Sequence, residues 1–266
     1  MPEDIYQAIV RLRREQTLAA LATIVDTKGS TPGKLAQKMV VLGDGSIIGT
    51  IGGGCLEADV IRSALDCLDT GLPRKMQFSL SGLEAERTGL ACGGKLEVMV
   101  EPLNEPEVYV VGCGHVGAKI ADLAARSGFK LTVFDDRPDF ANAEKFPDAD
   151  RVVCAELDDI GKHLSLGPNC YLISVTRGHN HDYEVMKWAL GTPVRFIGII
   201  GSRAKKIQFF KDLEKEGHPT SDRERIKCPV GLDIGAKNPD EIAVSVVAEL
   251  ISLRRRGQRD LGTTKS

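Results

Sequence analysis

Two cysteines flanked by glycines are the residues of this chain best placed for chemistry. Cys55 directly follows the run Gly52, Gly53 and Gly54, and Cys92 directly precedes Gly93 and Gly94. Three consecutive glycines cost conformational entropy, which an unusual backbone path or the close approach of a ligand would justify. An apolar pattern of helical spacing begins at Leu56, so Cys55 is expected in the first turn of a helix, where free N–H groups favour a thiolate or a bound anion.

A polar turn at residues 28–32, Lys-Gly-Ser-Thr-Pro, is a third such loop in the N-terminal part. Together the loops indicate a site for an anionic ligand with a thiophilic centre, and Cys55 and Cys92 are the candidate metal contacts. The alternative is that the glycines only form turns and that the cysteines are incidental. The chain has 7 cysteines, and their scatter without any C-x-x-C pair argues against a disulfide framework and a structural zinc site.

A second candidate site is a dinucleotide-type fingerprint formed by Gly112, Gly114 and Gly117, which follow an apolar strand and open a helix. Asp135 lies about 20 residues further on, at the end of the next predicted strand. The first glycine permits the sharp turn, the second lets a phosphate approach the backbone, and the third lets the helix pack closely on the strand. Asp135 would accept hydrogen bonds from ribose hydroxyls. The alternative is that the glycines serve packing alone and that no dinucleotide binds.

Polar residues also follow two later predicted strands. Residues 176–182 lie on the side of a doubly wound sheet where ligands bind. His179, His181 and Asp182 could together hold a metal, or Asn180 or Asp182 could cap the following helix. Arg203 follows the next predicted strand and is available to a phosphate.

Apolar periodicity predicts the elements that carry these residues. In the N-terminal part, strands are expected at residues 18–25, 38–42, 46–51, 74–80 and 95–101, and a helix follows Gly54. Gly43, Asp44 and Gly45 predict a hairpin between two of these strands. In the C-terminal part, apolar runs at residues 108–111, 131–134, 151–153, 171–175 and 196–200 alternate with helix-length segments, which predicts a parallel sheet with helices on both faces.

These patterns predict an α/β protein with two domains. The proline-containing segment at residues 102–107 is the best candidate boundary. We therefore expect a small mixed α/β N-terminal domain over residues 1–103 and a Rossmann-like, doubly wound parallel-sheet domain over residues 104–266.

Composition narrows the classes of function. The chain of 266 residues is 42% apolar and 27% charged, as in ordinary globular proteins. Its 35 basic and 37 acidic residues give a net charge of −2, which is not the electrostatic footprint of a nucleic-acid-binding protein. No apolar stretch approaches the roughly 20 residues needed to cross a bilayer, and the acidic start is the reverse of a secretory signal, so we expect a cytoplasmic protein with no membrane span.

The motifs taken together resemble the XdhC/CoxI family, the accessory proteins that bind molybdenum cofactor and help to mature xanthine dehydrogenase and related molybdenum hydroxylases. The resemblance covers nearly the whole chain and rests on residues 29–32, 51–57, 92–94, 112–117, 135–137, 176–182, 199–203 and 229–250. The chain departs from the family pattern at Gly33, Ala36 and Gln37, where an arginine and a Gly-Ala pair are common, and at Cys113, where alanine is usual.

The resemblance implies a carrier and not a catalyst. Such a protein holds the cofactor while a separate cysteine desulfurase adds the terminal sulfido ligand, and then passes it to a xanthine dehydrogenase-type apoenzyme. Helix N-termini at Gly54 and Gly114 would cradle the anionic parts of the cofactor, and Cys55 and Cys92 would be soft contacts for its molybdenum. The resemblance also implies a homodimer.

Two other functions stay open at this point. A small NAD(P)-dependent oxidoreductase would use the glycine fingerprint and Asp135, with His179 or His181 as the proton-transfer group. The neighbouring Asp136 and Arg137 leave the choice between NAD and NADP open. Such an enzyme gives no reason for the glycine and cysteine loops of the first domain. A docking scaffold that binds no cofactor is the third alternative.

Overall fold

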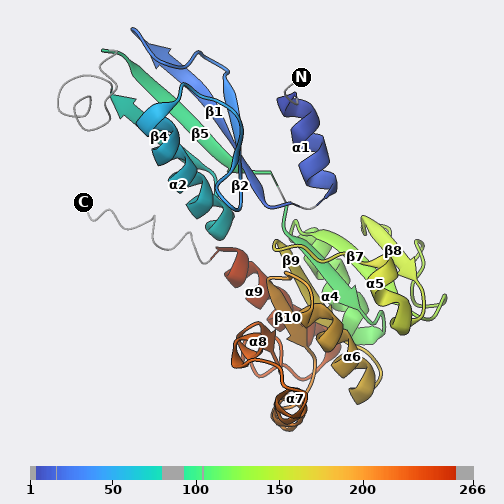
Figure 1. Ribbon diagram of the computed structural model, residues 1–266. Helices are drawn as coiled ribbons and strands as arrows, with labels where there is room; N and C mark the ends of the chain where they lie inside the picture. The colour runs from blue at the N-terminus through green and yellow to red at the C-terminus, as the bar shows by residue number, and fades with distance from the viewer. Residues whose placement is uncertain (1–3, 16, 80–92, 104, 256–266) are drawn as a thin grey trace. The chain divides into compact units, whose positions relative to one another are not determined.

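The computed structural model describes residues 4–15, 17–79, 93–103 and 105–255. By its internal contacts the chain divides into two units. One comprises the described residues up to Leu103 together with Arg254 and Arg255, and the other comprises Glu105–Leu253. Each unit contains a sheet with helices packed on it (Figure 1).

Within the described residues, the N-terminal unit is built on an antiparallel sheet of five strands in the order β3-β2-β1-β5-β4. The strands are β1 (Ala19–Lys28), β2 (Lys38–Leu42), β3 (Ile47–Gly49), β4 (Arg74–Ser79) and β5 (Lys95–Pro102). Successive residues of a strand face opposite sides, so Ala20 and Ala22 pack with α2 (Gly54–Thr70), whereas Ala19 packs with α1 (Ile5–Arg14). The two helices therefore cover opposite faces of this sheet.

The predicted hairpin between β2 and β3 is confirmed. Leu42 donates its N–H to the Ser46 carbonyl at 2.9 Å, and the Asp44 carboxylate accepts from the Ser46 N–H at 2.9 Å and from its hydroxyl at 2.6 Å. The predicted strand at residues 46–51 is too long, because β3 ends at Gly49. Gly49 has φ +81°, and this left-handed conformation breaks the extended backbone.

The C-terminal unit is a doubly wound α/β structure, as predicted. Among its described residues, six parallel strands pair in the order β11-β10-β9-β6-β7-β8. The strands are β6 (Glu107–Val111), β7 (Lys130–Asp135), β8 (Arg151–Cys154), β9 (Cys170–Ser174), β10 (Phe196–Ile199) and β11 (Ile226–Lys227). The strand order reverses between β6 and β9, and ligands of such sheets bind in the crevice outside the carboxyl ends of these two strands.

Helices cover both faces of this parallel sheet. On one face, Val108 and Val110 pack with the helices α4 (His115–Arg126) and α9 (Pro239–Arg255). On the other, Tyr109 and Val111 pack with α6 (His179–Leu190) and α7 (Arg203–Lys215). Shorter helical segments are η1 (Leu157–Asp159), α5 (Ile160–His163) and α8 (Thr220–Glu224). Two of the short elements, α8 and β11, were not predicted, since each is too short to show a period.

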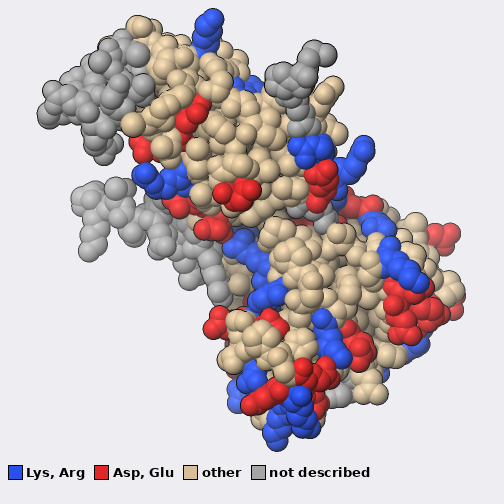
Figure 2. Space-filling view, in the orientation of Figure 1, with Lys and Arg blue, Asp and Glu red and all other residues tan. Residues whose placement is uncertain are grey.

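Basic and acidic side chains are interspersed on the visible face of each unit (Figure 2), in keeping with the net charge of −2. None of the helices in the described part of the chain is long and apolar enough to cross a membrane.

Gly112→Ala is expected to destabilise the C-terminal unit. A Cβ at Gly112 would lie 2.3 Å from the Val175 carbonyl oxygen, at a φ of +102°. Gly128→Ala is the matched control, because Gly128 also has a positive φ, +76°, but its Cβ would meet nothing within 4 Å. Chemical denaturation should give a loss of more than about 2 kcal/mol for the first variant and about 1 kcal/mol for the second. Equal losses of stability in the two variants would contradict the close contact between Gly112 and the Val175 carbonyl.

Candidate functional site

The glycine turn between β6 and α4 contains two glycines required by packing and one that is not. A Cβ at Gly117 would lie 1.8 Å from the Gly112 carbonyl oxygen, so the helix touches the turn only because Gly117 lacks a side chain. Gly114 differs, because its Cβ would meet nothing within 4 Å. It is the N-cap of α4 and gives the first N–H groups of the helix no side-chain cap. Gly114 therefore leaves the helix N-terminus accessible to an anion.

The Asp135 carboxylate joins this turn to the end of β7. It is 4% exposed and accepts from the Cys113 N–H at 2.7 Å, the Arg137 N–H at 3.1 Å and the Arg137 guanidinium at 2.8 and 2.9 Å. Burial alone would raise the pKa of Asp135, but the hydrogen bonds from Arg137 and Cys113 outweigh it and lower the pKa. The carboxylate is saturated within the protein, and its role toward a ribose stays a prediction.

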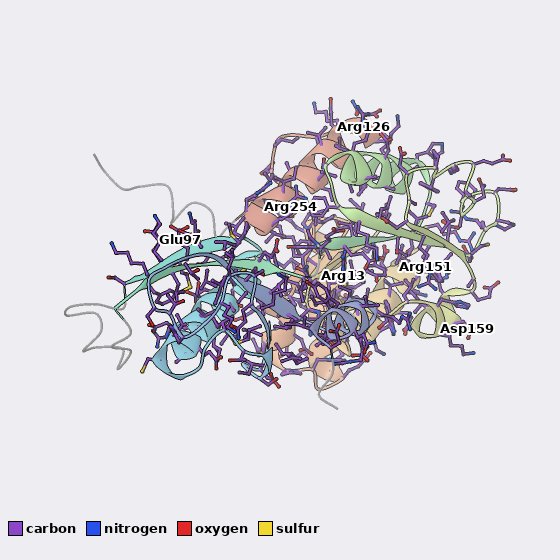
Figure 3. All side chains as sticks on the ribbon, turned by 90° about the horizontal axis from the view of Figure 1, so that it is seen from above. Arg13, Glu97, Arg126, Arg151, Asp159 and Arg254 are labelled. Carbon is purple, nitrogen blue, oxygen red and sulfur yellow. The ribbon has the colours of Figure 1, made fainter. Side chains whose placement is uncertain are left out.

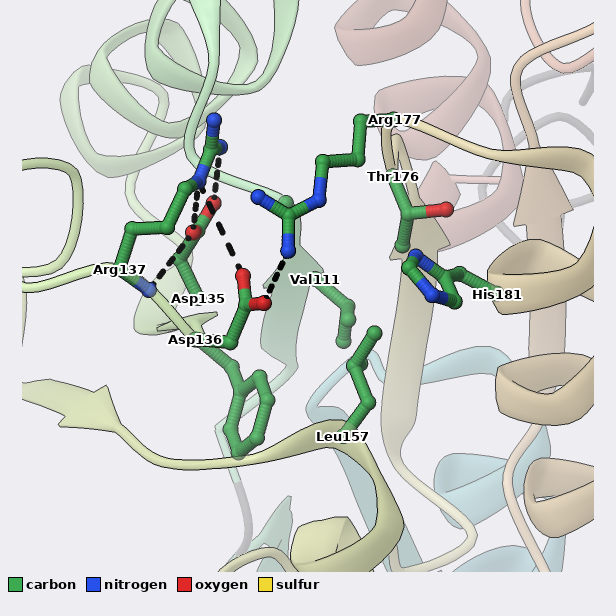
Figure 4. Close-up of a pocket in the computed structure, with 10 residues that line it drawn as sticks. Val111, Asp135, Asp136, Arg137, Leu157, Thr176, Arg177 and His181 are labelled. Carbon is green, nitrogen blue, oxygen red and sulfur yellow. Dashed lines mark hydrogen bonds and ion pairs between the residues drawn. The ribbon is translucent and has the colours of Figure 1, made fainter.

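Asp136, the next residue, faces a pocket at the carboxyl ends of β6, β7 and β9 (Figure 4). It is paired with Arg177, which comes from the loop after β9. The pocket is lined by Val111, Gly112, Phe134, Asp135, Asp136, Arg137, Leu157, Thr176, Arg177 and His181. The Nδ1 atom of His181 is buried without a hydrogen-bond partner in the described structure. The fold thus brings the glycine turn, Asp135 and His181 together where the strand order reverses.

Asp182 anchors the end of β9 and does not cap α6, whose N-cap is Gly178. Its carboxylate is 1% exposed, accepts from the Ser174 hydroxyl at 2.6 Å and the Thr176 hydroxyl at 2.7 Å, and pairs with Lys205. The prediction that Asn180 or Asp182 caps the helix was wrong, because α6 has no side-chain cap and Lys205 on α7 binds the Asp182 carboxylate instead. Among the described residues, no three His, Cys, Asp or Glu side chains are grouped as a metal site, and the side chain of His179 lies outside them.

Three glycine loops of the N-terminal unit pack backbone against backbone. A Cβ at Gly94 would lie 2.2 Å from the Ser30 carbonyl oxygen, and one at Gly33 would lie 2.3 Å from the Ile51 carbonyl oxygen. The turn after β1 therefore contacts both the loop before α2 and the loop before β5. A Cβ at Gly53, by contrast, would stand in open space. Cys92 lies outside the described residues, so its contact with a metal stays a prediction.

Glu57 holds the loop that precedes α2. Its Oε1 atom accepts from the Ile51 N–H and the Gly53 N–H, each at 3.0 Å, and from the Thr50 hydroxyl. Burial would raise the pKa of Glu57, but these hydrogen bonds lower it overall. This role was not predicted. Its signal is a glutamate in the first turn of a helix that follows a glycine run, because such a side chain reaches back to loop N–H groups.

A polar hollow of about 290 Å³ adjoins the glycine turn after β1. It is lined by Asp26, Lys28, Gln77, Phe78, Ser79, Lys95, Leu96 and Glu97. Lys28 and Lys95 lie directly opposite each other on β1 and β5, where like charges repel and an anion would be favoured. Glu97 on β5 (Figure 3) is paired with Lys75 at 2.7 Å. The lysine pair is a candidate anion contact that sequence spacing alone does not reveal.

Burial separates the thiols of the described residues into two classes. Cys55 and Cys154 are exposed, whereas Cys67, Cys113, Cys170 and Cys228 are buried. Burial raises the pKa of Cys113 to about 12 and those of Cys67 and Cys170 to about 11. Since the thiolate is the form that binds metals, the exposed Cys55 at the start of α2 is the better placed soft ligand.

Arg203 does not lie at the pocket of Asp135 and Asp136. It is the first residue of α7 and lines a separate groove beyond the ends of β10 and β11, together with Lys206 and Lys227. The structure therefore does not bring all of the predicted C-terminal site residues into one pocket.

The strand order and the glycine turn define a Rossmann-type protein with an additional antiparallel unit. Residues 108–250 match the XdhC Rossmann domain, and residues 12–79 match the XdhC and CoxI family. The chain belongs to the XdhC and CoxI family, as its motifs predict.

Relatives extend the comparison. The chain is 34% identical over 253 residues to the Escherichia coli protein named uncharacterized protein YqeB, covering 94% of this chain and 46% of the relative. It is 34% identical over 157 residues to a Bacillus subtilis protein named as a probable subunit of xanthine dehydrogenase, covering 59% of this chain and 45% of the relative. The chain thus spans less than half the length of these two relatives.

Two further similarities cover nearly whole chains. The Escherichia coli protein named molybdenum cofactor insertion chaperone PaoD is 22% identical, covering 97% of this chain and 91% of the relative. A crystal structure from Bacillus halodurans, described as a xanthine dehydrogenase, shares the fold with a TM-score of 0.51 and 22% identity, covering 98% of this chain and 97% of that one.

Asp135→Asn is expected to destabilise the protein by on the order of 2 kcal/mol at pH 7, less than for a fully buried pair because Arg137 is partly exposed. The folded pKa of Asp135 is lowered, so its contribution is present above the unfolded value of about 3.9 and is lost as pH falls through the folded value. Urea denaturation from pH 7 to pH 3 should show the difference from wild type shrinking. The exposed Asp139→Asn is the control, and a difference independent of pH would contradict the assignment.

Glu57→Ala is expected to release the loop before α2. The Ile51 and Gly53 amides lose their acceptor, so hydrogen exchange at these two amides should accelerate at least about tenfold, while amides in the middle of α2 keep their protection. Glu57→Gln retains an acceptor oxygen and should give a smaller acceleration. Unchanged exchange at both amides in Glu57→Ala would show that Glu57 does not hold the loop before α2.

Proposed function

We propose that this chain is a carrier of molybdenum cofactor and that its N-terminal glycine loops hold the cofactor as cargo. The observation that carries the proposal is the convergence of three glycine loops, packed backbone to backbone, beside the exposed thiol of Cys55. Membership of the XdhC and CoxI family supports it, as does the relative named a molybdenum cofactor insertion chaperone.

The chemistry of the loops suits this cargo. Molybdenum cofactor is a pterin with a dithiolene-bound metal and a terminal phosphate, so a carrier needs soft ligands, an anion contact and a surface that a flat ring can approach. Cys55 and Cys92 supply the soft contacts to the metal. Gly52 and Gly94 bring the loops together, and Gly53 and Gly93, where a Cβ would meet nothing within 4 Å, leave room for the cofactor close to the backbone that leads into Gly54. Lys28 and Lys95 are available to the phosphate.

The carrier itself makes and breaks no bond in the cargo. A separate cysteine desulfurase supplies the terminal sulfur while the cofactor is held, and the loaded cofactor is then inserted into a xanthine dehydrogenase-type enzyme. The relative named as a probable subunit of xanthine dehydrogenase supports a client of this type. In this proposal the carrier acts as a cytoplasmic homodimer. The nucleotide-binding role is a separate prediction that concerns the C-terminal unit and is not part of the carrier function. It was predicted for Gly112, Gly114, Gly117, Asp135 and Arg203.

Anaerobic titration with molybdenum cofactor tests the proposal. Pterin and molybdenum retained per chain after gel filtration should approach one of each, and Cys55→Ala should weaken retention about tenfold or more. Cys154→Ala is the matched control, because Cys154 is also exposed but lies in the C-terminal unit.

Full retention of the cofactor in both Cys55→Ala and Cys92→Ala would show that neither thiol is needed for binding. No retention by the wild-type chain would refute the carrier function. The alternative function, an NAD(P)-dependent oxidoreductase, predicts a different result. It requires substrate-dependent oxidation of NADH or NADPH that depends on His179 or His181.

A further inference from the structure

We propose that the groove beyond the ends of β10 and β11 is the surface on which the enzyme that receives the cargo docks. The occupant is a segment of that enzyme with acidic residues around an apolar anchor. This inference rests on the proposed carrier function, because it names the surface through which the carrier meets its client. It concerns the C-terminal unit alone and is separate from the pocket of Asp135 and Asp136.

The groove is large and has open apolar walls. It measures about 860 Å³ and is lined by the end of β10, the first turns of α7 and the segment that runs from β11 into α9. Three large aliphatic side chains line it while partly open to solvent: Ile207 is 57% exposed, Leu232 is 42% exposed and Ile234 is 53% exposed. Large aliphatic side chains gathered around one exposed hollow are typical of an interaction surface.

The segment that carries Leu232 and Ile234 is fixed against α9. The Gly231 N–H donates to the buried Glu249 carboxylate at 2.7 Å, and the Ser245 hydroxyl donates to the Leu232 carbonyl at 2.5 Å. A Cβ at Gly231 would lie 2.3 Å from the Ser245 Oγ atom, so the segment lies directly against the helix. A fixed backbone therefore presents the two aliphatic side chains, which lowers the ordering cost of binding.

The charged residues of the groove are mostly basic. Arg203, Lys206 and Lys227 line it, and only Asp233 is acidic among its described lining residues. Lys227 is paired with Glu249 at 3.4 Å, whereas within the described chain neither Arg203 nor Lys206 makes an ion pair. Uncompensated positive charge beside apolar walls favours a partner with acidic residues around an apolar anchor.

The open walls favour a protein over a small molecule. A small-molecule site encloses roughly 70–90% of the surface of its ligand. Ile207 and Ile234 line this groove with more than half of their surface open to solvent. Covering both side chains requires a broad surface, which a protein segment provides.

The charges also argue against a second copy of this chain as the occupant. A two-fold contact places the same surface on both sides of the interface. Arg203 and Lys206 would then face the same two residues of the other copy, with Asp233 as the acidic residue of each groove. Like charges placed opposite each other across an interface are unfavourable, so an acidic partner fits better.

Binding of the full chain to a xanthine dehydrogenase-type enzyme from the same organism, prepared without molybdenum cofactor, tests the proposal. Biolayer interferometry should show a complex with the wild-type chain. Ile234→Asp, and Arg203→Glu combined with Lys206→Glu, should each weaken the complex at least about tenfold, because the first places a charge on the apolar wall and the second reverses the basic charge.

Two variants outside the groove are the matched controls. Val10→Asp changes a side chain that is 61% exposed on α1, and Lys211→Glu reverses an exposed charge on α7 that does not line the groove. Both should bind within about twofold of wild type. Since salt screens exposed charges, raising NaCl from about 50 mM to about 500 mM should weaken wild-type binding at least about tenfold.

Photocrosslinking identifies the segment that occupies the groove. The photoreactive amino acid p-benzoylphenylalanine in place of Ile234 should cross-link to the apoenzyme, and in place of Val10 it should not. Mass spectrometry of the cross-linked peptide should find more Asp and Glu than Lys and Arg. A basic peptide, or a cross-link to a second copy of this chain alone, would overturn the proposed occupant.

Retention of molybdenum cofactor distinguishes this proposal from the carrier function. The groove variants should retain the cofactor as the wild-type chain does, which also shows that they fold. Cofactor retention without any binding of the apoenzyme, or equal binding by wild type and the groove variants, overturns the docking surface. Apoenzyme binding that depends on the groove, in a chain that retains no cofactor, refutes the carrier function and leaves the docking surface in place.

Discussion

Backbone segments in both units approach one another to distances that leave no room for a Cβ. In the N-terminal unit the turn after β1 lies against the loops before α2 and β5 through Gly33 and Gly94. In the C-terminal unit the turn after β6 lies against the end of β9 and the start of α4 through Gly112 and Gly117. Each candidate site is built around such a contact. Beside these contacts stand other glycines, Gly53 and Gly93 in the first unit and Gly114 in the second, where a Cβ would meet nothing within 4 Å and a ligand can approach the backbone.

Buried or half-buried carboxylates hold these bare loops in place. Glu57 fixes the loop before α2, Asp135 fixes the turn after β6, and Asp182 fixes the loop after β9. Each carboxylate gathers N–H or hydroxyl donors that the loop itself cannot satisfy. The loops are thereby shaped before any ligand arrives, which lowers the ordering cost that binding must overcome.

The architecture could be predicted from the sequence because apolar periodicity and turn residues depend only on neighbours along the chain. The alternating apolar runs gave the parallel sheet, and the glycines at 43 and 45 gave the hairpin. The partners of the carboxylates were not predictable in the same way. Lys205 meets Asp182 from another helix, and Asp135 accepts from the Cys113 N–H of a turn that precedes it by more than 20 residues. Such pairings depend on tertiary contacts, which residue spacing does not encode. For the same reason the lysine pair across β1 and β5 emerged only from the strand register.

Burial keeps four of the six described thiols away from metal ions and oxidants. Cys67, Cys113 and Cys170 stay protonated at neutral pH because burial raises their pKa values. A protonated, inaccessible thiol is a poor nucleophile toward oxidants and a poor ligand for stray zinc or copper ions. The soft-ligand chemistry of the described chain is therefore confined to the few thiols at its surface. A protein that handles a thiophilic metal gains from this arrangement, because its own interior does not compete for the metal.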